Sequence, residues 1–237
     1  MRLLRSIAGA SLLCTGIFGV HLQASADLPK PDGGKFHLMI QNKSIGTDTF
    51  RLLPDGCDSD VSIMAGNGGA VTFHQSLKYV KGQLSKLTTN AGELGTMEVT
   101  FAGDKSSLKV GDKPVTTQKL PGNPYPYGDK SPHLLAFLVS AYDVKKGGEQ
   151  KFDLIYSEAV GPKGVVVMPA VLRAPTSETK QVGGKPLATM HFPLTVNGAA
   201  GPIQMEIVTD KERHVLLWHV PAQKYFGVRE GFKDLAK

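Results

Sequence analysis

Two histidines near the C-terminal end of the chain are the first residues whose types could do chemistry. His214 and His219 flank Trp218, the only tryptophan, and imidazole is both a common metal ligand and an acid–base group that titrates near neutral pH. On an extended strand, residues an odd number apart point to opposite faces, so these two rings cannot converge on one metal ion. The other histidines are isolated, with no HxH, HExxH or zinc-type Cys/His spacing. The sequence predicts no metal site and no cofactor.

Nucleophilic catalysis would need an activated serine or cysteine. The chain has no GxSxG or SxxK motif. Cys57 is the only cysteine after residue 26, and PDGCDSD surrounds it with carboxylates, which raise the pKa of a thiol and disfavour the reactive thiolate. We expect an ordinary buried or loop thiol, with a disulfide-linked dimer as the alternative. Paired carboxylates depend on spatial separation and stay an open question, but no motif names a reaction, and we favour a protein without catalytic residues.

A proline- and tyrosine-rich segment, LPGNPYPYGDK, is the most unusual polar stretch. Proline stiffens it, and Tyr125 and Tyr127 offer flat amphipathic surface. The C-terminal KYFGVREGF adds Tyr225 and an exposed Arg229. We predict that these four residues bind a protein partner. The alternatives are a rigid crossover for the first segment and a tail docked on the domain for the second.

The N-terminal end predicts export. Residues 1–26 combine Arg2 and Arg5, an apolar stretch and small residues at Ala24 and Ala26, the layout of a secretory signal peptide. The apolar stretch is shorter than the roughly 20 residues of a spanning helix, and no later segment approaches that length. We expect a flexible segment at 27–34, a single β-rich domain at 35–237, no transmembrane segment, and a periplasmic or secreted location.

The charges argue against a nucleic-acid partner. The chain has 27 Lys and Arg against 21 Asp and Glu, a formal net charge of +6. They are interspersed, and no basic run is longer than a pair such as Lys145-Lys146. A nucleic-acid footprint needs a concentrated basic patch, so the pattern favours an ordinary solvated surface.

Alternation of apolar and polar residues dominates the chain from Lys35 onward. AVTFHQSLKYV places Val71, Phe73, Leu77 and Tyr79 in phase, and KFHLMIQ and TMEVTFAG follow the same rule. A period of two is typical of strands with one packed and one solvated face. The sequence therefore predicts a mainly β fold with antiparallel strands.

One segment, about residues 132–145, predicts the main α-helix. Ser131 is placed to cap it, Pro132 suits the first turn, and Gly147-Gly148 ends it beyond Lys145 and Lys146. The apolar residues then share one helical face: Leu134, Leu135, Leu138, Val139 and Tyr142. This face must lie on the sheet, either as a plug over the core or as the lid of a lipophilic cavity.

The last hairpin can be assigned a register. If Asp210-Lys211 is a two-residue turn, Trp218 faces Ile203 and His214 faces Ile207, and one face of the pair is apolar. Trp218 is then a core anchor. Pro221 ends the strand because proline cannot donate to a ladder.

Three stretches carry a resemblance: FHLMIQNKSIGTDTFRLL, HLLAFLVSAYDVKKGGEQKFDLIY and VPAQKYFGVREGF. They look like the β-rich domain of some bacterial exported proteins, including the region that precedes the catalytic domain of certain secreted α/β-hydrolases. The layout is also similar to uncharacterised periplasmic proteins with a half-open β-barrel like that of lipoprotein carriers. The resemblance implies a curved antiparallel sheet, or half-open β-barrel, packed on one main helix.

A concave sheet with one apolar helix favours binding of a hydrophobic or lipid-like molecule in the cell envelope. The candidate ligand-binding residues are Phe73, Phe101, Leu135, Leu138, Tyr142, Met205 and Trp218. The alternative is an interaction module that partners a secreted hydrolase or another envelope protein.

Overall fold

The structure, a computed structural model, describes the chain except residues 1–26, 65–67, 114, 121, 162–163 and 237. The predicted signal peptide thus lies outside the described residues. The strands form one sheet in the order β8-β7-β6-β5-β4-β3-β2-β1-β16-β15-β14-β13-β11-β10-β9, with β12 paired to β13. The strands are β1 (Asp32–Ile40), β2 (Lys43–Leu53), β3 (Gly56–Met64), β4 (Ala70–Val80), β5 (Gln83–Asn90), β6 (Thr96–Ala102), β7 (Lys105–Val110), β8 (Thr116–Lys119), β9 (Tyr125–Tyr127), β10 (Gln150–Gly161), β11 (Gly164–Leu172), β12 (Thr176–Val182), β13 (Lys185–Gly198), β14 (Gly201–Asp210), β15 (Val215–Val220) and β16 (Tyr225–Arg229).

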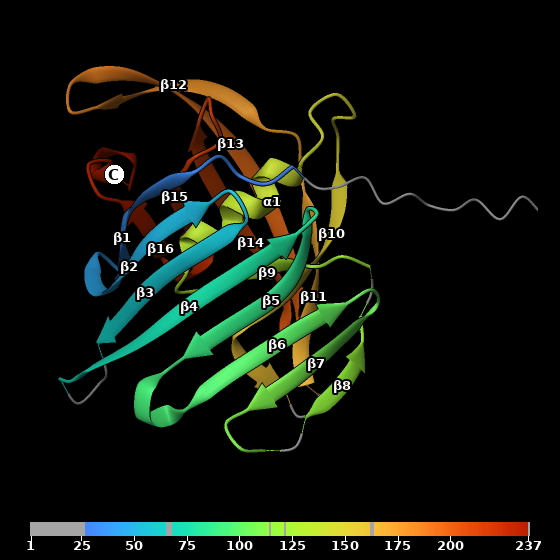
Figure 1. Cartoon of the computed structure of the whole chain (residues 1–237). Helices are drawn as coiled ribbons and strands as arrows, with labels where there is room; N and C mark the ends of the chain where they lie inside the picture. Colours follow the sequence, from blue (N-terminus) through green and yellow to red (C-terminus); the bar gives the residue numbers. More distant parts are fainter. Residues whose placement is uncertain (1–26, 65–67, 114, 121, 162–163, 237) are drawn as a thin grey trace, which may run out of the picture.

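The sheet curls around one short helix. Strand β8 contacts β11 although the two lie far apart in the strand order. Figure 1 shows α1 (Leu135–Ala141) between the blue-to-green strands and the orange-to-red strands. The prediction of a mainly β fold with a curved sheet around one main helix is confirmed. Two details differ: β9 runs parallel to β10, and β1 begins at Asp32, inside the segment expected to be flexible.

The helix is shorter than the sequence predicts. Residues Pro132–Leu134 form the 3-10 helix η2, and α1 ends at Ala141 because Tyr142 is extended. Ser131 does not cap it, since its hydroxyl donates to Gln75 and Glu158 instead. Three further 3-10 helices are η1 (Gly92–Leu94), η3 (Pro221–Gln223) and η4 (Lys233–Ala236).

The predicted register of the last hairpin is wrong. Ile207 pairs with Trp218, and Asp210 accepts the backbone N–H groups of Glu212 and His214, which makes a longer loop than two residues. The pairing is offset from the predicted one by an even number of residues, so the faces are unchanged. Trp218 is therefore buried, as predicted, while His214 leaves the strand and contacts the Asp210 carboxylate through Nδ1 at 2.9 Å.

Cys57 lies on β3 and not in a loop, because PDGCDSD includes the start of that strand. It is buried in the main core, which confirms the buried alternative and removes the thiol from any partner surface. Burial raises the pKa of the thiol, and the nearby carboxylates of Asp48 and Asp58 raise it further. The thiol is inert by both criteria.

Candidate functional site

Five of the predicted ligand-binding residues pack as core. Leu135, Leu138, Tyr142, Met205 and Trp218 are 0–3% exposed and belong to one cluster. The five side chains pack within this interior cluster, so α1 fills the curl as a plug. Phe73 and Phe101 are partly buried. Phe101 lines a separate groove together with Leu84 and Pro124. Ligand binding by this set stays a prediction that would require the core to open.

The predicted partner-binding residues do not share a surface. Tyr127 and Tyr225 are buried, and Tyr125 is partly buried with its ring edge-on to Phe152. Arg229 was expected to be exposed, but its side chain is only 15% exposed. Its guanidinium donates to both carboxylate oxygens of Asp32 at 2.7 Å, a bidentate pair that ties β16 to β1.

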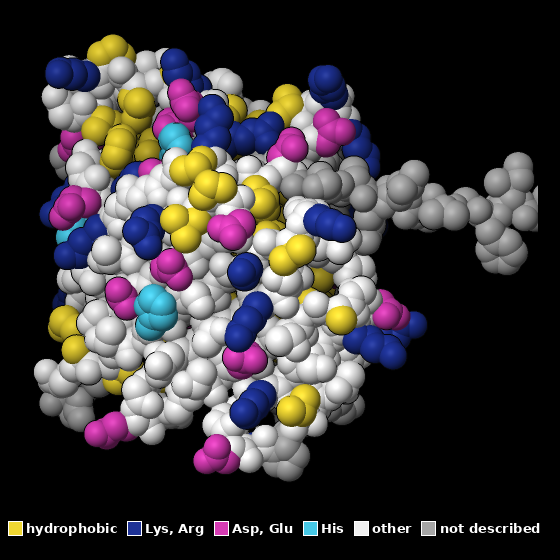
Figure 2. All heavy atoms as spheres, in the orientation of Figure 1, with side chains coloured by type: hydrophobic (Ala, Val, Ile, Leu, Met, Phe, Trp, Pro, Cys, Tyr) yellow, Lys and Arg dark blue, Asp and Glu magenta, His cyan; other side chains and the backbone are white. Residues whose placement is uncertain are grey.

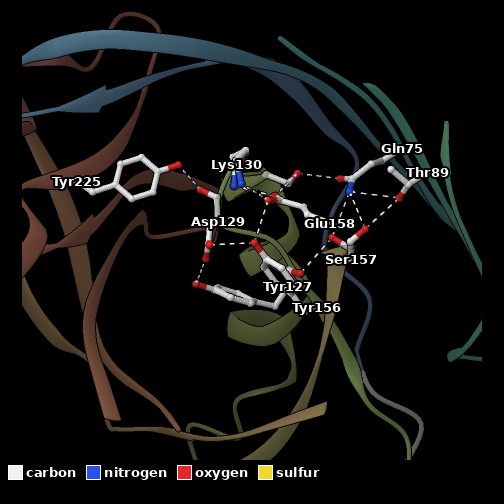
Figure 3. Close-up of polar contacts among 10 residues, drawn as sticks. Gln75, Thr89, Tyr127, Asp129, Lys130, Tyr156, Ser157, Glu158 and Tyr225 are labelled. Atoms are coloured by element: carbon white, nitrogen blue, oxygen red, sulfur yellow. Dashed lines mark hydrogen bonds and ion pairs between the residues drawn. The ribbon is translucent and has the colours of Figure 1, made fainter. Parts of the chain in front are cut away.

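Two of these tyrosines belong to a polar hub inside the curl, drawn in Figure 3. Tyr127 and Tyr156 donate to the two carboxylate oxygens of Asp129 at 2.7 and 2.9 Å. Tyr225 donates to the backbone carbonyl of Asp129 at 2.6 Å. Burial raises the pKa of all three phenols, so they remain neutral donors.

The other half of the hub surrounds Glu158, whose side chain is 4% exposed. One carboxylate oxygen accepts from the backbone N–H of Lys130 at 2.7 Å, and the other from the Lys130 ammonium at 3.0 Å. Burial raises the pKa of Glu158, while Lys130 lowers it. A buried carboxyl with a raised pKa can mark a catalytic acid.

Glu158 is nevertheless held by protein groups. Both its carboxylate oxygens accept hydrogen bonds from Lys130. The Ser131 hydroxyl contacts both Glu158 and Gln75 of β4, and the Gln75 amide donates to the Ser157 hydroxyl of β10. The hub therefore joins strands on opposite sides of the curl. It cross-links the interior of the fold, and its buried polar side-chain atoms have hydrogen-bond partners.

A more open site lies on the outer face of the sheet. The register of β14, β15 and β16 places Glu206, His219 and Phe226 in one row across the strands, and Val208 and Leu217 side by side in the next. Strand β12 and η4 contact each other above this face. Together they leave a groove of about 400 Å³, here called the C-terminal groove, lined by Gln41, Asn42, Lys180, His191, Glu206, Val208, Leu217, His219, Pro221, Lys224, Phe226, Leu235 and Ala236.

The C-terminal groove has an apolar floor and a polar rim. Val208 and Leu217 are buried with Val228, and Phe226, Leu235 and Ala236 pack against them. Figure 2 shows hydrophobic side chains gathered beside β12 and the C-terminal end of the chain. Two of the polar lining residues, Lys180 and His191, form ion pairs with Glu178. Apolar floor and charged rim are the two components of a site for an amphipathic molecule.

Sequence reasoning missed the C-terminal groove, although one signal was present. The run HVLLWHV is apolar at consecutive positions, which is typical of a strand covered on both faces. Leu217 was placed on the face away from Trp218, where the alternation rule would put polar residues. The structure covers that face with η4.

Among the described residues, no group of three or more His, Cys, Asp or Glu side chains is arranged to hold a metal ion. No helix in the described part of the chain combines the length and apolar character needed to cross a bilayer.

Comparison with known proteins gives one structural similarity. No protein-family model matches the chain, and no curated protein matches it. The crystal structure of a β-barrel-like protein of domain of unknown function DUF1849 from Brucella abortus is similar with a TM-score of 0.48 and 9% sequence identity. The similarity covers 86% of this chain and 97% of that chain.

Proposed function

We propose that this chain is an exported cell-envelope protein that binds a small hydrophobic or lipid-like molecule in the C-terminal groove. The observation that carries the proposal is the apolar floor of Val208, Leu217 and Phe226 beneath a cover formed by η4. A volume of about 400 Å³ falls within the range of small-molecule sites. The signal-peptide pattern of residues 1–26 supports export.

Binding is favoured over catalysis because the buried ionisable groups of the polar hub already bond to one another and the Cys57 thiol is buried. The carboxylates and phenols of the polar hub are tied to one another, and the Cys57 thiol is buried with a raised pKa. The C-terminal groove presents a surface for contact and no activated nucleophile.

The uncharged fluorescent probe N-phenyl-1-naphthylamine tests the proposal. It should bind the mature protein, and Leu235→Asp should weaken binding at least tenfold by placing a charge against the apolar floor. Val80→Asp is the control, since Val80 is 51% exposed and lies outside the groove. Absence of probe binding, or equal loss in both variants, would refute the assignment.

The interaction-module alternative stays a prediction. Of its four residues, Tyr125 and Arg229 are partly exposed, and Tyr125 follows Pro124, which lines the same groove as Phe101. Pull-down from envelope extracts with wild type and Tyr125→Ala would test it. Capture of the same proteins by both would count against docking through Tyr125.

A further inference from the structure

One end of the C-terminal groove gathers hydrogen-bond donors. Asn42 and Gln41 stand at the turn between β1 and β2, and Lys224 follows η3. Within the described chain, the side chains of these three residues make no hydrogen bond or ion pair with protein groups. His219 also lines the groove and packs edge-on to Phe226.

The backbone fixes Lys224 at this end. Its N–H donates to Pro221 and its carbonyl accepts from the N–H of Gln41, at 3.1 and 2.9 Å. Lys224 adopts a positive φ of 49° at the end of η3 and lines the groove there, beside Gln41. A cation and two amides beside an apolar floor suit the head of an anionic amphiphile.

The groove also contains a second lysine, Lys180, and a carboxylate, Glu206. Lys180 is already engaged by Glu178 at 3.0 Å. Glu206 is the carboxylate among the lining residues and lies directly across the strands from His219. Among the described residues, Lys224 is thus the lysine of the groove without a carboxylate partner.

We infer that the ligand of the C-terminal groove carries an anionic head group, a carboxylate or a phosphate, which Lys224 binds while the apolar chain lies on Leu217 and Phe226. This inference rests on the proposed function and specifies the ligand class. Two lining residues then act with opposite sign: Lys224 attracts the head group, and Glu206 repels it.

Four amphiphiles with one twelve-carbon chain test the inference: dodecanoate, dodecyl phosphate, dodecanol and dodecyltrimethylammonium. Each is titrated by calorimetry at pH 7.5, below its critical micelle concentration. We expect the two anions to bind about tenfold more tightly than dodecanol, since a hydrogen bond to a charged group contributes about that factor. The preferred anion shows whether the head is a carboxylate or a phosphate.

The variants supply the second readout. Lys224→Met keeps the apolar stem and should bind dodecanoate no more tightly than dodecanol. Glu206→Gln should bind dodecanoate severalfold more tightly than the wild type does. Lys81→Met is the matched control, because Lys81 also has a positive φ, 53°, and lies outside this groove. Neither substitution at 224 nor at 206 should change dodecanol binding.

The outcomes separate the two claims. If no amphiphile binds, or Leu235→Asp leaves all affinities unchanged, the proposed function fails. If all four bind with similar affinity, or Lys224→Met matches Lys81→Met, the groove binds chains and only the anionic head group is overturned. Preferential binding of dodecyltrimethylammonium would overturn it as well.

Discussion

His133 and Asp48 form a buried pair at the centre of the fold. Both side chains are fully buried, and Nδ1 of His133 lies 2.6 Å from a carboxylate oxygen of Asp48. The imidazole also stacks on Phe50, with ring centroids 5.4 Å apart and planes 8° from parallel. The pair attaches η2, and with it the start of α1, to the inner face of β2.

Replacing Asp48 with alanine should therefore be costly. The variant leaves a buried imidazole without its partner, and breaking such a pair costs about 3–5 kcal/mol. Urea unfolding followed by Trp218 fluorescence measures the loss. Asp58→Ala is the control, because Asp58 meets Arg51 at 3.7 Å on the surface and should cost less than about 1 kcal/mol. Equal costs would contradict a role for the buried pair.

Glu158 predicts a pH dependence of stability. Its pKa is raised in the fold, chiefly by burial, so the folded state holds the proton more tightly than the unfolded chain. This contribution is fully present below the ordinary value of 4.5 and is lost as pH rises through the folded pKa. Glu158→Gln lacks it, so the unfolding free energy of the variant relative to wild type should increase from pH 4 to pH 7. A constant or falling difference would contradict the raised pKa.

At the scale of elements, the helix shows how a distant residue sets a boundary. Arg213, in the loop between β14 and β15, donates through one guanidinium nitrogen to the carbonyls of Val139, Ser140 and Tyr142 at 3.0–3.2 Å. It satisfies the last carbonyls of α1, which have no partner within the helix.

Arg213→Met should destabilise the protein by about 1.5–3 kcal/mol, because charge-assisted hydrogen bonds to the helix end are lost while the apolar stem is kept. Thermal unfolding by circular dichroism measures it. Arg173→Met, which removes a surface pair with Glu149 at 2.8 Å, serves as the comparison and should have little effect. A smaller loss at Arg213 than at Arg173 would exclude the capping role.

Local patterns predicted the types of element well and their ends poorly. The apolar face of Leu135 and Leu138 was enough to predict the helix, because helical spacing is encoded within a few neighbouring residues. Its C-terminal carbonyls are bound by Arg213, about seventy residues further along the chain, a contact that local spacing does not encode. The hairpin is similar: the apolar face of Trp218 was predictable, but Asp210 builds a loop whose length alternation does not encode.

At the scale of the whole molecule, the first and last of the described strands are neighbours in the sheet. Strand β16 pairs with β1 on one side and β15 on the other. What the sequence suggested to be a docked tail is therefore an interior strand, and only residues after Arg229 extend beyond it. The groove likewise combines turns and strands from residue 41 to residue 236, and no local motif records such an assembly.

Two truncations distinguish the role of the residues after β16 from the role of β16 itself. Removal of residues 231–237 should keep the fold but weaken binding of N-phenyl-1-naphthylamine, because Leu235 and Ala236 cover the groove floor. Removal of 221–237 deletes β16 and should abolish cooperative unfolding. Circular dichroism and probe fluorescence together give the answer. A folded, fully binding product of the longer truncation would contradict both assignments.

The position of β16 also has a consequence for biosynthesis. Strand β1 leaves the ribosome first among the described strands, and β16, which pairs with its free edge, leaves after all the others. Until then the growing chain carries two exposed sheet edges, one on β1 and one on β15, which neighbouring molecules could pair with. The pairing of β1 with β16 can therefore form only after all the other described strands have been synthesised.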